Sequence, residues 1–257
     1  MYQDGKGKYR TVRLLGKGAF AEVYLVEDEG GRAYACKIST HADILEREAG
    51  FQREALHPLF PEAYDFWREA HTACLLMEYI PGESLEGLIR RNGRLADIRA
   101  AQIGCSLAEG LSWLHEKREP LLFRDIKPAN VMLTPAGEVR LIDFGCACRP
   151  GSSADRAGSI GFGAPEQFEP GAAQTTAADI YGLGRTLQKM TAGGSRGLLK
   201  RITQKCTICN PQERLWDMRE VLELLTLCKG RSRARADARQ RAVLKGEIRM
   251  LREICEC

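Results

Sequence analysis

Apolar and polar residues alternate along two short segments near the start of the chain, at 11–15 and 22–26, and a turn leads from the second into a third run at 32–38. Because successive side chains of a strand point to opposite faces, this pattern predicts three strands joined by tight turns. A fourth apolar run, at 74–79, predicts another strand that ends before a proline and a glycine. The first third of the chain is therefore expected to form a small antiparallel sheet.

Helical spacing of apolar residues replaces the alternation elsewhere. Residues 44–56 have helical character, and 95–116 and 177–190 are expected to form longer helices. Strands followed by helices predict an α+β protein with two lobes in one domain, 1–228. We place a small sheet lobe with one helix at about 9–80, a hinge at about 78–83 and a larger, mainly α-helical lobe at about 83–228. Nucleotide sites commonly form at such junctions.

Composition is that of a globular protein, with 44% hydrophobic and 28% charged residues among 257. No apolar run approaches the ~20 residues that cross a bilayer, and the polar start of the chain lacks a signal peptide's apolar stretch. We therefore expect a cytoplasmic protein with reduced, buried thiols. Cys206 and Cys209 have the spacing of half a zinc site, but packing is the favoured interpretation because no second such pair follows.

Positive charge is concentrated at the C-terminus. The formal net charge is +4, and residues 229–257 alone contain nine Lys or Arg against four Asp or Glu. The rest of the chain therefore carries no strong nucleic-acid signal. Leu244, Ile248, Leu251 and Cys255 recur at helical spacing, which predicts a basic helical tail. This tail could pack on the larger lobe, self-associate, bind nucleic acid as an arm, or contact an anionic surface.

Two polar motifs interrupt the helical part of the chain. Residues 123–130, Phe-Arg-Asp-Ile-Lys-Pro-Ala-Asn, supply a carboxylate, an ammonium group and an amide in one loop. Residues 143–145, Asp-Phe-Gly, add a second carboxylate beside a glycine that lets the backbone turn. Phosphoryl transfer needs an acid that orients a hydroxyl, a cation that neutralises phosphate, and oxygen ligands for hard cations. The two motifs together supply all of these groups.

The two motifs resemble the catalytic loop and the metal-binding loop of the eukaryotic-type protein kinase family, Ser/Thr type. The resemblance implies that Asp125 orients the hydroxyl of a protein Ser or Thr and that Lys127 neutralises the γ-phosphoryl group of ATP. It implies that Asn130 and Asp143 bind Mg²⁺, with Mn²⁺ as an alternative. Gln167, directly after Ala-Pro-Glu, makes the chain most similar to bacterial Ser/Thr protein kinases.

Further matches to the family fall in the expected nucleotide site. Lys37 would contact the α- and β-phosphates and pair with a helix glutamate, for which Glu48 is the candidate. The turn at 16–23 resembles the phosphate-covering loop, with Ala21 where the family has a third glycine. Met77 would guard the pocket behind adenine. The residues that the resemblance assigns to nucleotide binding are Gly16, Lys17, Gly18, Ala19, Phe20, Val23, Ala35, Lys37, Met77, Glu78, Ile80 and Glu83.

One residue of the catalytic loop departs from the family pattern. Phe123 stands where the family usually has His or Tyr, and we expect looser ordering of the site rather than loss of chemistry. Phe123 and Ala21 are the only sequence support for the alternative, a pseudokinase that acts as a nucleotide-binding scaffold. A small-molecule phosphotransferase is disfavoured because the segment that ends in Ala-Pro-Glu is complete.

The segment at 146–163 corresponds to the family's activation segment. Arg124, beside the catalytic acid, could pair with a phosphate there and order the segment. Ser152 and Ser153 are the favoured phosphorylation sites because glycine, serine and arginine surround them. Ser159 corresponds to the residue that hydrogen-bonds near the catalytic acid and lysine. These serines could equally be ordinary loop residues.

Three further matches are structural rather than catalytic. Arg214 is expected to pair with Glu166, and Asp179 is expected to brace the backbone of the catalytic loop.

Cys146, directly after the metal-binding motif, could be redox-sensitive if its thiol were exposed and acidic. Packing is the favoured interpretation of this cysteine.

Overall fold

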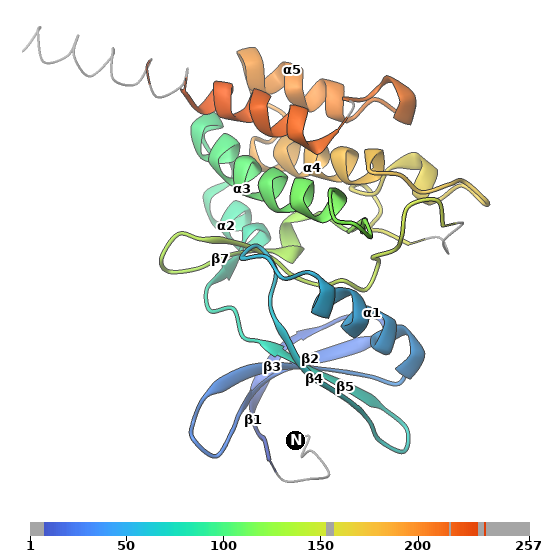
Figure 1. Ribbon diagram of the computed structural model, residues 1–257. Coiled ribbons are helices and arrows are strands. Elements are labelled where there is room, and N and C mark those ends of the chain that lie inside the picture. Colours follow the sequence, from blue (N-terminus) through green and yellow to red (C-terminus); the bar gives the residue numbers. More distant parts are fainter. Residues whose placement is uncertain (1–7, 153–156, 216, 231–233, 235–257) are drawn as a thin grey trace, which may run out of the picture.

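The computed structural model describes residues 8–152, 157–215, 217–230 and 234, and these form two lobes (Figure 1). The smaller lobe is a five-stranded antiparallel sheet with the order β1-β2-β3-β5-β4. Its strands are β1 (Arg10–Lys17), β2 (Ala21–Glu27), β3 (Ala33–Ser39), β4 (Ala63–Arg68) and β5 (Ala73–Glu78). One helix, α1 (Ala42–Glu54), packs against this sheet. The predicted α+β class, with a small sheet lobe that contains one helix, is confirmed.

Apolar residues cover both faces of the small sheet. On one face, Cys36 is buried with Leu76 in a layer flanked by aromatic side chains. On the other face, Leu45 of α1 packs against Leu75. Because neighbouring residues of a strand point to opposite faces, burial of Cys36 directs Lys37 toward α1. The geometry of the strand thus orients its lysine.

The larger lobe contains the helices α2 (Leu85–Asn92), α3 (Asp97–His115), α4 (Ala177–Met190) and α5 (Gly197–Cys206), and residues 218–230 are also helical. The predicted helices at 95–116 and 177–190 correspond to α3 and α4. A Cβ atom on Gly184 of α4 would lie 2.5 Å from the Cβ of Cys206. Glycine at this position therefore allows α4 and α5 to cross closely.

Four strands escaped prediction. The strands β6 (Glu83–Ser84), β7 (Val131–Leu133) and β8 (Val139–Leu141) form an antiparallel sheet inside the lobe expected to be mainly helical. They are too short for a pattern of alternation to be recognised. The strand β4 is longer, but a register shift between Ala63 and Asp65 breaks its alternation. The pair β7–β8 lies between the two polar motifs and thereby joins them.

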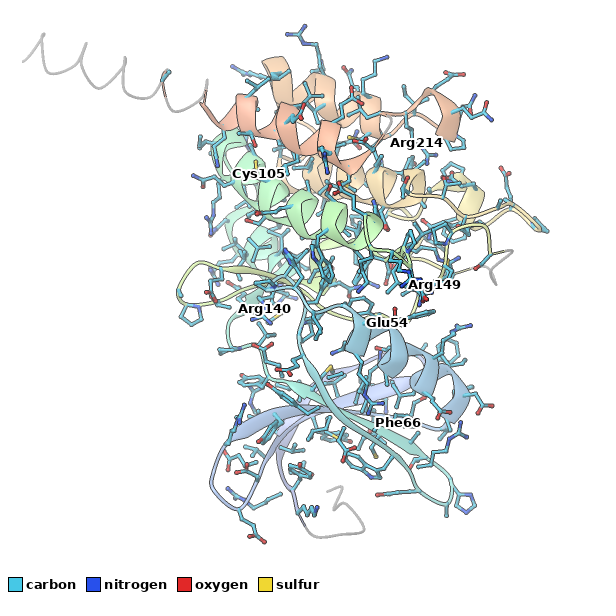
Figure 2. The ribbon with its side chains drawn as sticks, viewed as in Figure 1. Glu54, Phe66, Cys105, Arg140, Arg149 and Arg214 are labelled. Carbon is cyan, nitrogen blue, oxygen red and sulfur yellow. The ribbon has the colours of Figure 1, made fainter. Side chains whose placement is uncertain are left out.

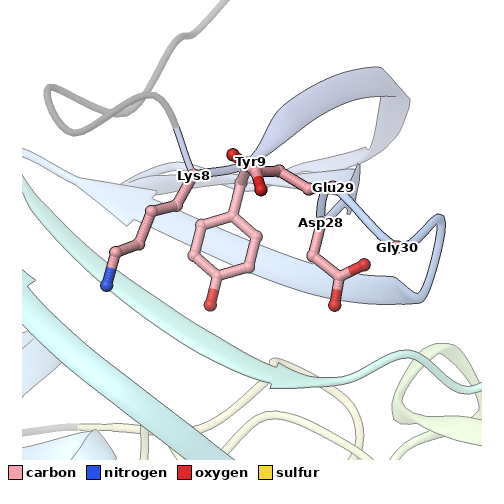
Figure 3. A pocket seen from close by; sticks show the side chains of 5 residues that line it. All are labelled: Lys8, Tyr9, Asp28, Glu29 and Gly30. Carbon is pink, nitrogen blue, oxygen red and sulfur yellow. The ribbon is translucent and has the colours of Figure 1, made fainter.

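Several other features lie outside the polar motifs. A shallow hollow of about 350 Å³ at the turn between β2 and β3 is lined by Lys8, Tyr9, Asp28, Glu29 and Gly30 (Figure 3). Within the described part of the chain, no helix has both the length and the hydrophobicity needed to cross a bilayer. Cys206 is buried, whereas Cys209 is exposed. The basic tail predicted at 229–257 falls outside the described residues, except for 229, 230 and 234.

Candidate active site

Side chains from both lobes meet at the ammonium group of Lys37. Its Nζ lies 2.6 and 2.8 Å from the two carboxylate oxygens of Glu48 on α1. On the other side, it lies 2.7 Å from Oδ1 of Asp143 in the second polar motif. Glu46 and Glu54, the neighbouring acids of α1, pair instead with arginines. The structure thus pairs Lys37 with the glutamate proposed from the sequence.

Burial and mutual charge shift the pKa values of these three groups. The pKa values of Glu48 and Lys37 are raised, and the pKa of Asp143 is lowered. Burial raises the pKa of Glu48 to about 7, although the ammonium group of Lys37 opposes this shift. Burial alone would lower the pKa of Lys37, but Asp143 and Glu48 raise it above its ordinary value. The protein packed around the carboxylate of Asp143 would raise its pKa, yet Lys37 and the N–H of Gly145 hold it below its usual range. The site therefore keeps a charged ammonium group beside an ionised Asp143.

Asp125 of the first polar motif is held by two residues of the same loop. Its Oδ2 accepts hydrogen bonds from Nζ of Lys127 at 2.8 Å and from Nδ2 of Asn130 at 3.0 Å. Asn130 also donates to the backbone oxygen of Asp125 at 2.9 Å. The other carboxylate oxygen, Oδ1, is buried without a hydrogen-bond partner among the described residues. Such an oxygen is costly to leave unsatisfied, so it is ready to accept a hydrogen bond from a bound molecule.

The catalytic loop is contacted by Ser159 of the activation segment and by Gln167, which lies just beyond the end of that segment. Oγ of Ser159 lies 2.6 Å from Nζ of Lys127. The buried side chain of Gln167 donates to the backbone oxygens of Arg124 and Ala157, at 2.9 and 2.8 Å, and accepts from the N–H of Ala164 at 2.8 Å. Sequence reasoning treated Gln167 only as a mark of bacterial kinases and missed this structural role. Its one signal was its place directly after the Ala-Pro-Glu triplet.

Asp179 braces the backbone of the catalytic loop. Its Oδ2 accepts from the N–H of Phe123 at 2.9 Å, and its Oδ1 accepts from the N–H of Arg124 at 2.6 Å. Oδ2 also lies 2.7 Å from Nε2 of His115. Arg124 and Asp143 both adopt positive φ angles, 66° and 80°, which cost energy in residues other than glycine. The bonds from Asp179 to two consecutive backbone N–H groups hold the strained turn at Arg124.

Phe123 replaces the usual polar residue by aromatic packing. Its ring is fully buried and stacks on Phe60, with centroids 6.2 Å apart. It meets Phe144, the middle residue of the second motif, edge to face at 5.1 Å. Phe60 also contacts Phe144 at 5.2 Å. Three aromatic rings therefore link the two motifs, and the effect of Phe123 on activity stays a prediction.

Arg124 of the catalytic loop is buried and contacts Cys146, a half-buried residue at the start of the activation segment. The Nε of Arg124 donates to the backbone oxygen of Cys146 at 2.8 Å, and the side chain is 4% exposed. Burial, together with the charges of Asp125 and Asp143, raises the pKa of the Cys146 thiol to about 12. This thiol stays protonated at neutral pH, which opposes the redox role considered from the sequence. Ser152 donates to the backbone oxygen of Arg149 at 2.7 Å, and Ser153 lies outside the described residues.

The glycine-containing turn between β1 and β2 is closed by backbone contacts. Gly18 donates to the backbone oxygen of Ala21 at 2.8 Å, and Ser39 donates to that of Phe20 at 2.6 Å. A Cβ atom on Gly16 would meet no atom within 4 Å, so packing does not require glycine there. The exposed side chain of Lys17 pairs with Glu22 at 2.9 Å. The turn thus leaves open space where a ligand could approach.

The strand pairing places other predicted nucleotide residues near Lys37. Val23 lies opposite Lys37, and Ala35 lies opposite Met77. Directly opposite residues of antiparallel strands point to the same face of the sheet. Sδ of Met77 accepts a hydrogen bond from Nε2 of Gln52 on α1 at 3.4 Å. These residues share one face of the sheet, and Ala19 lies in the turn ahead of β2.

The hinge backbone differs between its two predicted contact residues. The N–H of Glu78 donates to the backbone oxygen of Glu62 at 2.8 Å, and its side chain binds Arg140 of β8. Among the described residues, neither the N–H nor the C=O of Ile80 has a hydrogen-bond partner. Ile80 therefore offers a free donor and acceptor to a bound base. The carboxylate of Glu83 pairs with Arg91 at 2.6 Å.

Arg214 and Glu166 form the buried pair expected from the sequence. Nη2 of Arg214 lies 2.8 Å from Oε2 of Glu166, and Nη1 contacts Oε1. The same guanidinium donates to the backbone oxygens of Ala177, Ile208 and Cys209. Both side chains are buried. This network ties the end of the activation segment to the body of the larger lobe.

Comparison with known proteins agrees with this geometry. Residues 9–220 match the description of the protein kinase domain. The chain is 34% identical over 207 residues to the serine/threonine-protein kinase pkn2 of Myxococcus xanthus, with coverage of 73% of this chain and 24% of that protein. It is 32% identical over 201 residues to PrkC of Bacillus subtilis, covering 73% of this chain and 31% of PrkC.

A eukaryotic relative, Aurora kinase A-A of Xenopus laevis, is 32% identical over 199 residues, with coverage of 71% of this chain and 48% of that protein. The chain thus spans less than half the length of each of these three relatives. The match nevertheless includes both lobes and both polar motifs, because residues 9–220 contain them. This chain belongs to the protein kinase family.

Proposed function

We propose that this chain is a Ser/Thr protein kinase, which transfers the γ-phosphoryl group of ATP to hydroxyl groups of proteins. The observation that carries the proposal is the buried Oδ1 of Asp125, which has no donor among the described residues. The hydroxyl of a protein Ser or Thr would donate to this oxygen and be oriented for attack. Lys127, 2.8 Å from the same carboxylate, supplies positive charge beside the reacting groups.

The nucleotide would bind between the hinge and Lys37. The free N–H and C=O of Ile80 suit the edge of an adenine base, and Glu83 would meet the ribose. Lys37 would contact the α- and β-phosphates, since two carboxylates hold its ammonium group in place. The open space at Gly16 suits a turn that covers phosphates.

The residues of the two motifs fit a hard divalent cation such as Mg²⁺, with Mn²⁺ as an alternative. The side chain of Asp143 is 42% exposed, so a metal can reach its carboxylate. Asn130 uses its side-chain nitrogen on Asp125, which leaves its amide oxygen as a ligand. Carboxylate and amide oxygens are the ligands that hard cations prefer. When bound, the ion neutralises charge on the phosphates.

A nucleotide-binding scaffold without catalysis is the competing proposal. Its sequence support was limited to Ala21 and Phe123. The first is a single methyl group in a turn, and the second packs between Phe60 and Phe144 without disturbing Asp125. No side chain that the catalytic proposal requires is missing from the described site. The kinase proposal is therefore the better supported of the two.

Transfer of radiolabelled phosphate from ATP to a generic basic protein tests the two proposals. We expect transfer by the wild-type chain with Mg²⁺ or Mn²⁺, and a loss of about 10²-fold or more in Asp143→Ala, because phosphate charge is then poorly neutralised. Asp65→Ala, on the exposed side of β4, is the matched control and should transfer normally. Absence of transfer by the wild-type chain with either ion would favour the scaffold.

We further propose that phosphorylation of the activation segment controls this activity. Among the described residues, the hydroxyl of Ser152 donates to the backbone oxygen of Arg149, whereas Ser159 is engaged by Lys127 beside the catalytic acid. A phosphate on Ser152 would add negative charge that Arg124, beside the catalytic acid, could pair with. Ser153, outside the described residues, is the other candidate.

Mass spectrometry after incubation with ATP tests this control. We expect phosphate on Ser152 or Ser153 and none on Ser159, since substitution of its Oγ would disrupt the contact with Lys127. A catalytically impaired Asp125→Asn chain incubated alone should stay unmodified. Full activity of a chain without any phosphate in this segment would contradict the proposal.

The expectations that concern the tail, the location of the protein and the domain boundaries stay predictions. Self-association and contact with an anionic surface depend on the tail at 229–257, and both stay predictions. The cytoplasmic location likewise stays a prediction. The domain and hinge boundaries are also retained as predictions.

A further inference from the structure

The end of helix α1 is bound to the activation segment by an ion pair. Nη2 of Arg149 lies 2.9 and 2.8 Å from the two carboxylate oxygens of Glu54, the last residue of α1. Figure 2 shows both side chains where α1 meets the larger lobe. The guanidinium carbon also lies 5.6 Å from the ring centre of Phe51, one turn earlier on the helix. Neither the pair nor its place on α1 was anticipated from the sequence.

The same guanidinium holds the segment that leads into the catalytic loop. Nη1 of Arg149 donates to the backbone oxygens of Glu119 and Pro120, at 2.7 and 3.4 Å. Nη2 also lies 3.1 Å from the carboxylate of Glu119. Cys148, the preceding residue, exchanges two backbone hydrogen bonds with Leu122, at 2.9 and 3.1 Å. Arg149 therefore joins α1, the activation segment and the approach to the catalytic loop.

The charge of Arg149 matters because of where Glu54 lies. The C-terminus of a helix carries partial negative charge, so a carboxylate there is destabilising unless a cation neutralises it. Lys117 already donates to the backbone oxygen of Glu54, which satisfies one of the last carbonyls. From the larger lobe, Arg149 contacts the carboxylate of Glu54, and the carboxylate of Glu119 lies on the same guanidinium nitrogen. Loss of Arg149 would leave an uncompensated negative charge on the last turn.

The position of this end of α1 matters for Glu48, because both residues lie on the same helix. The helix has 13 residues and is about 20 Å long, short enough to move as one rigid body. Near its start, Arg68 of β4 pairs with Asp43 at 2.7 Å and with Glu46. That contact lies within the small lobe and would move with the helix. The contacts at Glu54, in contrast, join the helix to the larger lobe.

We propose that Arg149 is a positioning residue that holds α1 against the larger lobe, so that Glu48 stays paired with Lys37. This inference rests on the proposed function, because it assigns a control point to the same site. It concerns a specific contact of this chain, between the sixth residue after Asp143 and the last residue of α1. Arg149 acts through Glu54 and touches none of the groups placed at the reacting atoms.

Arg149→Ala is the first variant, and hydrogen–deuterium exchange is the first measurement. We expect faster exchange at residues 42–54, with little change in β4 and β5. We also expect kcat/KM for phosphoryl transfer to fall by about three- to tenfold, the scale expected for a partly exposed network of charges. With side chains 32% and 40% exposed, Arg149 and Glu54 tolerate substitution without a buried cavity. Arg149→Lys keeps the charge without the two-nitrogen fork and should lie between Ala and wild type.

A second variant separates a positioning role from general destabilisation. Glu54→Gln removes the ion pair together with the negative charge at the helix end, so its own effect should be smaller than that of Arg149→Ala. The double variant Arg149→Ala, Glu54→Gln should recover part of the loss in both exchange and kcat/KM. Glu46→Gln is the matched control, because it removes a pair on the same helix that stays within the small lobe. It should leave both measurements unchanged.

The proposal is overturned if exchange at 42–54 in Arg149→Ala equals that of the wild type. It is also overturned if Glu46→Gln has the same effect, or if the double variant shows purely additive losses. If Arg149→Ala does not fold, the smaller Glu54→Gln change decides the question by the same exchange measurement. An inactive wild-type chain would refute the proposed function alone, because exchange reports the position of α1 without turnover.

Discussion

Replacement of Asp125 with Asn is expected to lower kcat for phosphoryl transfer by about 10²–10⁴-fold. Oδ2 of Asp125 faces two donors, Lys127 and Asn130, so the oxygen of the new amide must take that position. The NH₂ group is then left where the unpartnered Oδ1 lies. A donor would face the substrate hydroxyl in place of an acceptor, and it could neither orient nor accept the proton.

Steady-state kinetics at saturating ATP and acceptor measure this effect. The affinity for ATP should stay close to that of the wild type, because Asp125 binds its own loop and is not among the residues assigned to the nucleotide. Asp65→Asn is a matched control on β4, where the carboxylate accepts a hydrogen bond from the backbone N–H of Phe66. A loss of less than tenfold in Asp125→Asn would contradict the role assigned to Oδ1.

Replacement of Arg214 with Ala is expected to destabilise the folded chain by about 3–5 kcal/mol. The variant leaves the carboxylate of Glu166 buried without its partner. It also removes the donor from three backbone oxygens, which are those of Ala177, Ile208 and Cys209. For a chain of this size the loss corresponds to a fall in Tm of about 6–20 °C.

Thermal unfolding followed by circular dichroism measures this loss independently of any activity. Arg219→Ala is the matched control, because Arg219 pairs with Glu116 at the surface, where ion pairs contribute about 0–1 kcal/mol. The double variant Arg214→Met, Glu166→Leu should recover part of the stability, since no buried charge is left unpaired. Equal losses in Arg214→Ala and Arg219→Ala would show that burial of the first pair has no special effect.

The residues of the candidate site that lie close together in one loop could be predicted from the sequence. Asp125, Lys127 and Asn130 lie within six consecutive positions. Asp143 lies two residues before Gly145, a glycine that lets the backbone turn. Chemistry of this kind depends on residue type and close spacing, which a sequence displays directly. The first strands were likewise predicted from alternation, because period two is a local property.

Prediction failed where the signal was short, irregular or distant. The strands β7 and β8 have three residues each, and a bulge interrupts β4. Glu48 was correctly proposed among several acids on α1, but only the packing of that helix against the sheet brings it to Lys37. The roles of Gln167 and Arg149 went unnoticed, because their partners lie up to 95 residues away along the chain.

The sequence by itself determined which chemical groups this protein has, the broad succession from a strand-rich part to a helical part, and the family to which it belongs. Only the tertiary structure decided how those groups are paired. It left Oδ1 of Asp125 without a partner, joined Lys37 to Glu48 and Asp143, and tied the end of α1 to Arg149. The reason is physical: local patterns record which face of an element is buried, whereas hydrogen bonds and ion pairs depend on how distant elements pack together.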